Sequence, residues 1–139
     1  MKTNELIPWL EGRHEYYCDK VAAFFEFTDH LYKFNRPSIE FKAKAMRIAG
    51  QAYTQTAYPK CSYNLVYLVS MGGQYEQTIA HEVVHHAVNQ FDMNSAVHGD
   101  LFKFILNKIC GRRPAKYHEY TYNDTHVMLA QLLMAVLEK

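Results

Sequence analysis

The sequence lacks the clustered cysteines of a disulfide-rich fold or a zinc ribbon. Its three cysteines, Cys18, Cys61 and Cys110, lie far apart and form no C-x-x-C pair. A zinc ribbon needs four clustered ligands, so that kind of site is excluded. An odd number of isolated cysteines indicates free thiols, which are typical of a reducing compartment.

Long hydrophobic runs are also missing. No stretch approaches the length of a membrane span, and residues 1–9 contain no apolar core of signal-peptide length. We therefore expect a cytoplasmic, intracellular protein without a membrane partner; association with a nucleoid or a nucleus stays open. The chain has 139 residues, of which 49% are hydrophobic, so we expect one domain over residues 1–139 and leave its oligomeric state open.

Lysine and arginine are absent from residues 61–100, although the whole chain has a net charge of +1. The basic residues gather instead in residues 31–60 and 101–118. If the fold brings these two blocks together, they can form a phosphate-binding face for DNA. The candidate contacts are Lys42, Lys44, Arg47, Arg112 and Arg113. A solvated surface with a local charge bias is the alternative, because segregated charge alone is a weak indicator of nucleic-acid binding.

Residues 61–100, which lack lysine and arginine, contain histidines. Residues 81–85 read His-Glu-Val-Val-His, an H-E-x-x-H motif inside a segment, 74–90, whose apolar periodicity predicts a helix. His81 and His85 share one face of such a helix, so their ring nitrogens can bind one metal ion, with Glu82 beside it as a base. The phase of the helix keeps both histidines off its buried face. The motif therefore predicts a metal site.

A third ligand is expected outside the motif helix. The pattern H-E-x-x-H-x-x-G-x-x-H is excluded, because the chain has Val88 and Phe91 where that pattern needs Gly and His. A glutamate on a following helix has few candidates, since residues 83–118 contain no Glu. His98, at a loop-to-helix junction, is the best candidate; the reserves are His118 and His126. Three protein ligands and an open position are typical of a single catalytic Zn²⁺ ion.

The rest of the chain predicts an α+β fold in which helices pack on a small three-stranded sheet. Amphipathic periodicity predicts helices over residues 14–34, 74–90, 101–110 and 125–138, with Asp100 as an N-cap. Strands are predicted over residues 39–44, 46–53 and 62–70, and 116–122 is a further strand or an extended arm. Gly50 is expected to mark a bulge or a close approach of the backbone. The last helix is apolar on more than one face, which indicates burial in the core or a partner surface.

The histidine motif and the segment after it resemble a known family. His-Glu-Val-Val-His, a loop and then His-Gly-Asp-Leu-Phe at residues 98–102 are similar to the H-E-x-x-H … H-G-x-x-F signature of SprT-like zinc metalloproteases, the group that includes Spartan. The resemblance extends from about Ile39 to Cys110. It implies a zincin-like minimal metalloprotease core that acts on a polypeptide substrate. The implied roles are Glu82 as catalytic residue and His81, His85 and His98 as zinc ligands.

The same resemblance implies a link to DNA. Spartan-type members cut proteins crosslinked to DNA, and DNA stimulates them. SprT-like chains often continue into a zinc ribbon or a basic DNA-binding extension. Residues 111–139 hold a Tyr-rich segment and an apolar helix instead. Protease chemistry therefore carries over more directly than action on DNA-associated proteins.

The expected reaction is hydrolysis of a peptide bond by a zinc-bound water that Glu82 activates. An oxyanion also needs a donor, and the candidates are His86, Tyr117, His118 and Tyr120. His86 lies four positions from Glu82, so it either orients that carboxylate or faces solvent. Two further histidines, His14 and His30, are expected at the surface.

Two other functions stay open. The first is a non-catalytic zinc-containing module that binds nucleic acid or protein, although three histidines without cysteine argue against a purely structural site. The second is a zinc hydrolase that acts on a non-peptide amide. A substrate screen separates these functions from a protease.

Overall fold

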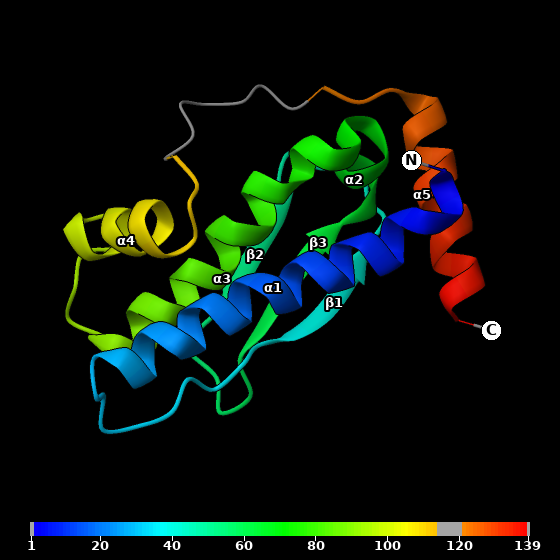
Figure 1. The fold of residues 1–139 in the computed structure, drawn as a ribbon. Helices are drawn as coiled ribbons and strands as arrows, with labels where there is room; N and C mark the ends of the chain where they lie inside the picture. Colours follow the sequence, from blue (N-terminus) through cyan, green and yellow to red (C-terminus); the bar gives the residue numbers. More distant parts are fainter. Residues whose placement is uncertain (1, 114–120, 139) are drawn as a thin grey trace.

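The computed structural model describes residues 2–113 and 121–138 (Figure 1). The predicted α+β fold is confirmed, with helices packed on a three-stranded mixed sheet. The elements in chain order are η1 (Thr3–Glu5), α1 (Leu6–Phe27), β1 (Ser38–Lys42), β2 (Gly50–Tyr53), β3 (Lys60–Asn64), α2 (Leu65–Met71), η2 (Gly72–Tyr75), α3 (Glu76–Phe91), α4 (Asp100–Phe104), η3 (Ile105–Ile109) and α5 (Asp124–Leu137). Within the described ranges, no helix combines the length and the hydropathy that a membrane crossing requires.

Strand β3 lies in the centre of the sheet, in the order β1-β3-β2. It runs parallel to β1, where Cys61 is opposite Ile39, and antiparallel to β2, where Cys61 is opposite Ala52. Cys61 and Tyr63 are fully buried. Helices α1 and α3 lie side by side across the sheet (Figure 1). Because the strand order is β1-β3-β2, β2 is an edge strand, and it packs next to α3.

Helix α1 begins and ends earlier than the predicted segment, 14–34. It starts at Leu6, and Pro8 lies in its first turn, where a proline does not interrupt the hydrogen bonds of a helix. It ends at Phe27, because Asp29 adopts a left-handed backbone conformation with φ of 55°. The predicted end at residue 34 was wrong by about two turns.

The predicted strand 62–70 is wrong from Leu65 onward. Strand β3 ends at Asn64, and the apolar run from Leu65 to Met71 is helix α2. The side chain of Asn64 accepts a hydrogen bond from the backbone N–H of Val66, which is the N-cap of that helix. Leu65, Val66, Tyr67 and Leu68 are all buried, and a run buried on every side has no period that separates a strand from a helix.

The segment predicted as strand 46–53 forms a strand only from Gly50. Asn64 holds the part before it, since its amide donates to the backbone oxygens of Lys44 and Ile48. The backbone oxygen of Ala49 accepts from the N–H of Asn64 and from the hydroxyl of Tyr75. Residues 46–49 are therefore a tethered loop rather than a strand.

The motif helix is confirmed as α3, within two residues of the predicted 74–90 at its N-terminal end. The helix after His98 divides into α4 and a π-helical turn, η3, and its N-cap is Gly99 rather than Asp100. Most of the predicted strand 116–122 lies outside the described residues, and residues 121–122 belong to no helix or strand.

The last helix is confirmed as α5, and Asn123 caps it by accepting from the N–H of His126. Helix α5 packs against α2. Only Ala130 of this helix is fully buried, while Met128, Leu132 and Val136 are exposed. Burial in the core therefore holds for Ala130 and in part for Val127, Leu133 and Met134, and a partner surface for the exposed side chains stays a prediction.

Candidate metal centre

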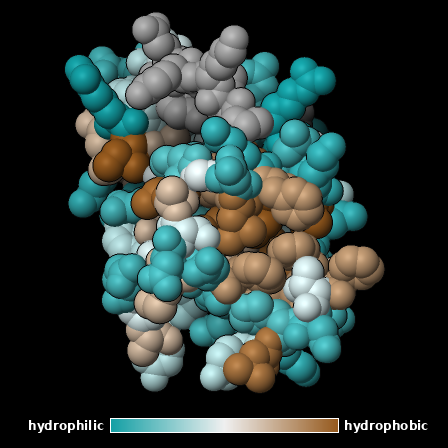
Figure 2. Space-filling model, turned by 90° about the vertical axis from the view of Figure 1, so that its left-hand side faces the viewer, coloured by the Kyte–Doolittle hydropathy of each residue, from teal (hydrophilic) through white to brown (hydrophobic). Residues whose placement is uncertain are grey.

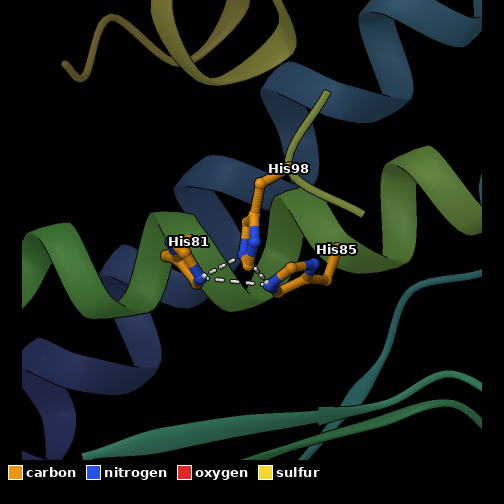
Figure 3. Close-up of side chains that lie close together, drawn as sticks. All are labelled: His81, His85 and His98. Atoms are coloured by element: carbon orange, nitrogen blue, oxygen red, sulfur yellow. Dashed lines mark hydrogen bonds between the residues drawn. The ribbon is translucent and has the colours of Figure 1, made fainter. Parts of the chain in front are cut away.

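Three histidine side chains from two segments turn toward one another (Figure 3). His81 and His85 lie one turn apart on α3, and His98 reaches them from the segment before α4. Their Nε2 atoms are 3.0 Å apart between His81 and His85, 3.4 Å between His81 and His98, and 3.2 Å between His85 and His98. The fold thus brings together the three histidines that the sequence singled out.

The donor set fits a single metal ion. Three nitrogens that each lie about 2.1 Å from a tetrahedral zinc ion are roughly 3.4 Å from one another, which is close to the separations of the three Nε2 atoms. Among the described residues, His81, His85 and His98 are a group that can hold a metal ion. The reserve ligand His126 is used elsewhere, because its Nδ1 accepts from the N–H of Asn123. The other reserve, His118, lies outside the described residues.

Phe102 supports all three rings. Its ring centroid lies 5.0 Å from that of His81, 4.8 Å from that of His85 and 5.0 Å from that of His98. Phe102 is itself buried. The sequence indicated it only as part of an apolar stripe and of the family signature, and its contact with every histidine of the cluster could not be read from spacing alone. It limits the orientations that the rings can adopt.

Burial keeps the two helix histidines neutral. Burial, and then the charge of His98, lowers the pKa of His81 to about 4. Burial, and then the charges of the neighbouring histidines, lowers the pKa of His85 to about 3. A neutral imidazole has a lone pair for a metal ion, whereas an imidazolium has none. The pocket therefore presents these rings in the form that binds a cation.

Glu82 lies buried beside β2. Its side chain is only 5% exposed, and burial raises its pKa to about 8 in the protein without a metal ion. Gly50 faces it closely: a Cβ atom at Gly50 would lie 2.8 Å from Cγ2 of Thr78 and 3.1 Å from Cγ of Glu82. The predicted close approach at Gly50 is confirmed. Only a glycine lets the edge strand run this near to the glutamate.

A cleft of about 510 Å³ lies between the edge strand and α3. Its walls come from β2, from Glu82 and His85 of α3, and from the loop that follows α3. Glu82 and one histidine of the cluster are thus exposed to the same space. An edge strand, a buried carboxylate and a metal-ligand cluster on one cleft can accommodate an extended chain and supply both a base and a cation site.

Apolar side chains are exposed at the end of the molecule that carries α4. Figure 2 shows this face, on which apolar surface gathers near the centre among polar side chains. Phe27 and Leu31 are 89% and 83% exposed, and Phe104 is 48% exposed. Exposed apolar surface is therefore available to another molecule on this part of the protein.

Three other histidines do not belong to the cluster. His86 is buried, and its Nε2 donates to the backbone oxygen of Lys60 at 2.9 Å, so the solvent-facing alternative is wrong. His14 is fully buried, and the expectation that it lies at the surface was also wrong. His30 is half-buried against the ring of Phe91. The remaining oxyanion candidates, Tyr117, His118 and Tyr120, lie outside the described residues.

The two basic blocks enter separate local contacts. Lys42 on β1 donates to the hydroxyl of Tyr53 at 2.9 Å, whereas Lys44 and Arg47 are exposed. Arg112 is half-buried, and its Nε donates to the side chain of Gln77 near the start of α3. The last candidate, Arg113, is exposed, and its backbone oxygen accepts from Gln77. Arg112 and Arg113 are therefore tied to the start of α3 through Gln77.

Sequence reasoning did not find the ion cluster that holds the start of α3. The carboxylate of Glu76 accepts from the hydroxyl of Tyr17 at 2.7 Å and pairs with Arg13, and its second oxygen lies 3.9 Å from Arg112. Its partners lie far away in the sequence, so local patterns carry no signal for it. The cluster fixes the N-terminal end of the helix that carries His81 and His85.

Comparison with known proteins identifies relatives. The model of the SprT-like family matches residues 21–126, a range that includes the three histidines, Glu82 and Phe102. Curated relatives named Protein SprT, from Pseudomonas aeruginosa strains LESB58, UCBPP-PA14 and PAO1, are each 29% identical over 104 residues. The match covers 73% of this chain and 62% of each relative, so the chain spans less than two thirds of their length. No solved structure matches the chain significantly.

Proposed function

The chain belongs to the SprT-like family, and on that premise we propose that it is a zinc-dependent metalloprotease with a zincin-like core. The observation that carries this proposal is the convergence of three Nε2 atoms, 3.0 to 3.4 Å apart, beside a buried glutamate on an open cleft. A structural zinc site is closed by four protein ligands, whereas three ligands leave a position for water. The donor set therefore supports hydrolysis better than a structural role.

The protein contributes positioning and a base. His81, His85 and His98 hold the ion, and Phe102 restricts their rings. A bound zinc ion supplies a Lewis acid for the scissile carbonyl and lowers the pKa of a coordinated water. Glu82 accepts the proton of the attacking water and delivers it to the leaving nitrogen. A nearby cation lowers the pKa of a buried carboxyl, so Glu82 is a carboxylate when it acts as this base.

The hydrogen bond of His86 removes this residue from the candidates for the donor that stabilises the oxyanion. Because its Nε2–H is donated to the backbone oxygen of Lys60, the Nδ1 of the neutral ring is an acceptor. Burial lowers the pKa of His86 to about 4, which keeps that ring neutral near pH 7. His86 thus has no second N–H to offer. We propose Tyr117, His118 or Tyr120 as the donor.

The first test replaces Glu82 by Gln. We expect the variant to keep stoichiometric zinc by atomic absorption and to cut an unfolded protein at least about 100-fold more slowly, because the base is lost while the ligands stay. Glu11→Gln, at an exposed position of α1, is the matched control and should cut like the parent. A Glu82→Gln protein that cuts at the parental rate would contradict the mechanism.

The same assay tests action on DNA-associated proteins. Lys44 and Arg47 are exposed and leave basic side chains for phosphate. We propose that single-stranded DNA accelerates cleavage by the parent and that added salt removes the acceleration. Equal rates with and without DNA would restrict the proposal to a protease without a DNA partner.

A further inference from the structure

The cleft beside Glu82 has an apolar part. Ile48, Met93 and Val97 line it and are 47%, 73% and 65% exposed. Large apolar side chains with this exposure lose water when another apolar group covers them, which favours binding. The space next to the proposed reaction centre is therefore suited to an apolar side chain of a substrate.

The carboxylic side chains of the cleft have no lysine or arginine side chain opposite them among the described lining residues. Glu82 and Asp92 are the acidic residues that line it, and no lysine or arginine lines it within the described part of the chain. This follows from the absence of lysine and arginine in residues 61–100, which supply most of its wall. Glu82 is buried at the proposed reaction centre, whereas Asp92 is exposed. Asp92 is thus the charge that an approaching side chain meets.

Asp92 is placed to attract a cation. It is the C-cap of α3, where the partial negative charge of the helix end adds to that of the carboxylate. Its Oδ1 accepts from the N–H of Asn94 at 3.1 Å, which fixes the side chain. Among the described residues, Oδ2 has no partner in an ion pair or hydrogen bond, and so stays available to a ligand.

The position of Asp92 sets a distance along the substrate. His85 and Asp92 are separated by about 10 Å along the helix axis, from a rise of roughly 1.5 Å per residue. An extended chain covers that distance in roughly three residues. A basic side chain that reaches Asp92 would therefore lie within about three residues of the bond at the metal centre.

We propose that this cleft selects polypeptide segments in which an apolar side chain lies against Ile48, Met93 and Val97 and a lysine or arginine lies against Asp92. The inference rests on the proposed protease function and names its substrate class. Segments with an acidic residue at the Asp92 position are rejected, because two carboxylates would face each other at a part of the cleft that no lysine or arginine of the described residues lines.

The test compares peptides that differ in one residue. Quenched fluorescent peptides carry a central Leu and, at each of the three positions on either side, Lys, Gln or Glu. With the zinc-loaded parent, we expect the best Lys peptide to exceed its Glu counterpart about five- to tenfold in kcat/KM, the effect of one part-exposed ion pair replaced by one repulsive pair. Replacing the central Leu by Asn should lower kcat/KM in the parent and less so in Ile48→Thr.

Variants of Asp92 show whether this residue is the cause. Asp92→Asn keeps an acceptor for the N–H of Asn94 and should bring the Lys-to-Glu ratio close to one. Asp92→Lys should invert the ratio. Glu11→Lys makes the same charge change at an exposed residue of α1 that does not line the cleft, and should leave the ratio unchanged. Because each ratio is taken within one variant, partial loss of folding cancels.

Two outcomes contradict the inference, and only the first of them also contradicts the protease function. If the zinc-loaded parent cuts neither these peptides nor an unfolded protein, the protease function and the inference both fail. If it cuts all the peptides at similar rates, or if Asp92→Lys keeps the parental preference, the inference fails and the protease function stands.

Discussion

Two sets of histidines in this protein differ in what their ring nitrogens face. The first set is the cluster of His81, His85 and His98, and the second set is the buried pair of His14 and His86. His14 and His86 each direct Nε2 at a backbone oxygen, that of Pro37 at 2.9 Å and that of Lys60 at 2.9 Å. His81 and His85, on the same helix as His86, direct Nε2 at each other and at His98. Burial lowers the pKa of His14 and His86 as well as that of His81 and His85, so a lowered pKa does not separate the two sets.

The partner atom is what separates the two sets. A backbone oxygen fixes one N–H and leaves the ring with a structural task. Nitrogens that face only other nitrogens would repel if protonated and need a shared cation to satisfy their lone pairs. The difference teaches that the candidate metal site is marked by ring nitrogens that face one another, rather than by histidine content.

The largest expected effect is the difference between variants of the neighbouring residues His85 and His86. His85→Asn should weaken zinc binding more than about 100-fold, beyond the cost of losing an outer-shell partner, and abolish cleavage. His86→Asn removes the donor to the backbone oxygen of Lys60 but no nitrogen of the cluster, so it should retain zinc and lower the free energy of unfolding by about 1–3 kcal/mol. Competition with a chromophoric chelator measures the affinity, and urea unfolding measures the stability.

Two results would contradict this division of the histidines into a metal-binding set and a structural set. If His86→Asn loses zinc as completely as His85→Asn, the helix as a whole supports the site rather than the nitrogens that converge. If neither variant loses zinc, the cluster is not the metal centre.

A smaller effect is expected at Phe102, whose ring contacts the three histidines of the cluster. Phe102→Leu keeps an apolar side chain but removes the flat ring between the histidines, so zinc affinity should fall about tenfold. The control is Phe24→Leu, which removes a ring that stacks on Phe91 at 5.2 Å and touches no histidine of the cluster. Both variants should lose similar stability, about 1–1.5 kcal/mol, measured by urea unfolding. Parental zinc affinity in Phe102→Leu would show that the histidines need no support from it.

The sequence predicted the first set of histidines well because helical spacing is local. Residues four apart meet on a helix face whatever the rest of the chain does, so the pairing of His81 with His85 follows from α3 alone. His98 joined them by elimination, and the fold brings it within 3.4 Å of both. For His86 the decisive partner is the oxygen of Lys60 on β3, and no local pattern predicts that contact.

The errors in the fold have a similar cause. The run after Asn64 reads as a strand because apolar residues buried on all sides have no period, and the N-cap at Asn64 was the one local signal for a helix. The start of α1 was placed eight residues too late, although Pro8 lies in its first turn, where a proline is tolerated. Cleft residues such as Asp92 and Ile48 come together only in three dimensions.

The smallest expected effect concerns His14, in the second set, and appears as a pH dependence of stability. Its Nε2 donates to the backbone oxygen of Pro37, and its Nδ1 accepts from the hydroxyl of Tyr63 at 2.8 Å. Burial lowers the pKa of His14, so below about pH 6.5 the unfolded chain binds a proton that the folded protein excludes. This contribution to the free energy of unfolding is present above pH 6.5 and is lost as the pH falls toward the folded-state pKa.

Urea unfolding of the metal-free protein between pH 7.5 and 5.5 measures this loss. His14 should account for up to about 1 kcal/mol between pH 6.5 and 5.5, so His14→Gln should show a shallower dependence while being less stable at pH 7.5. The metal-free parent also contains His81 and His85, whose pKa values are lowered to about 4 and 3, and these remain in the variant. The difference in slope between parent and variant therefore isolates His14. Identical slopes would mean that the buried ring takes up its proton in the folded state, and that an oxygen partner does not hold a histidine neutral here.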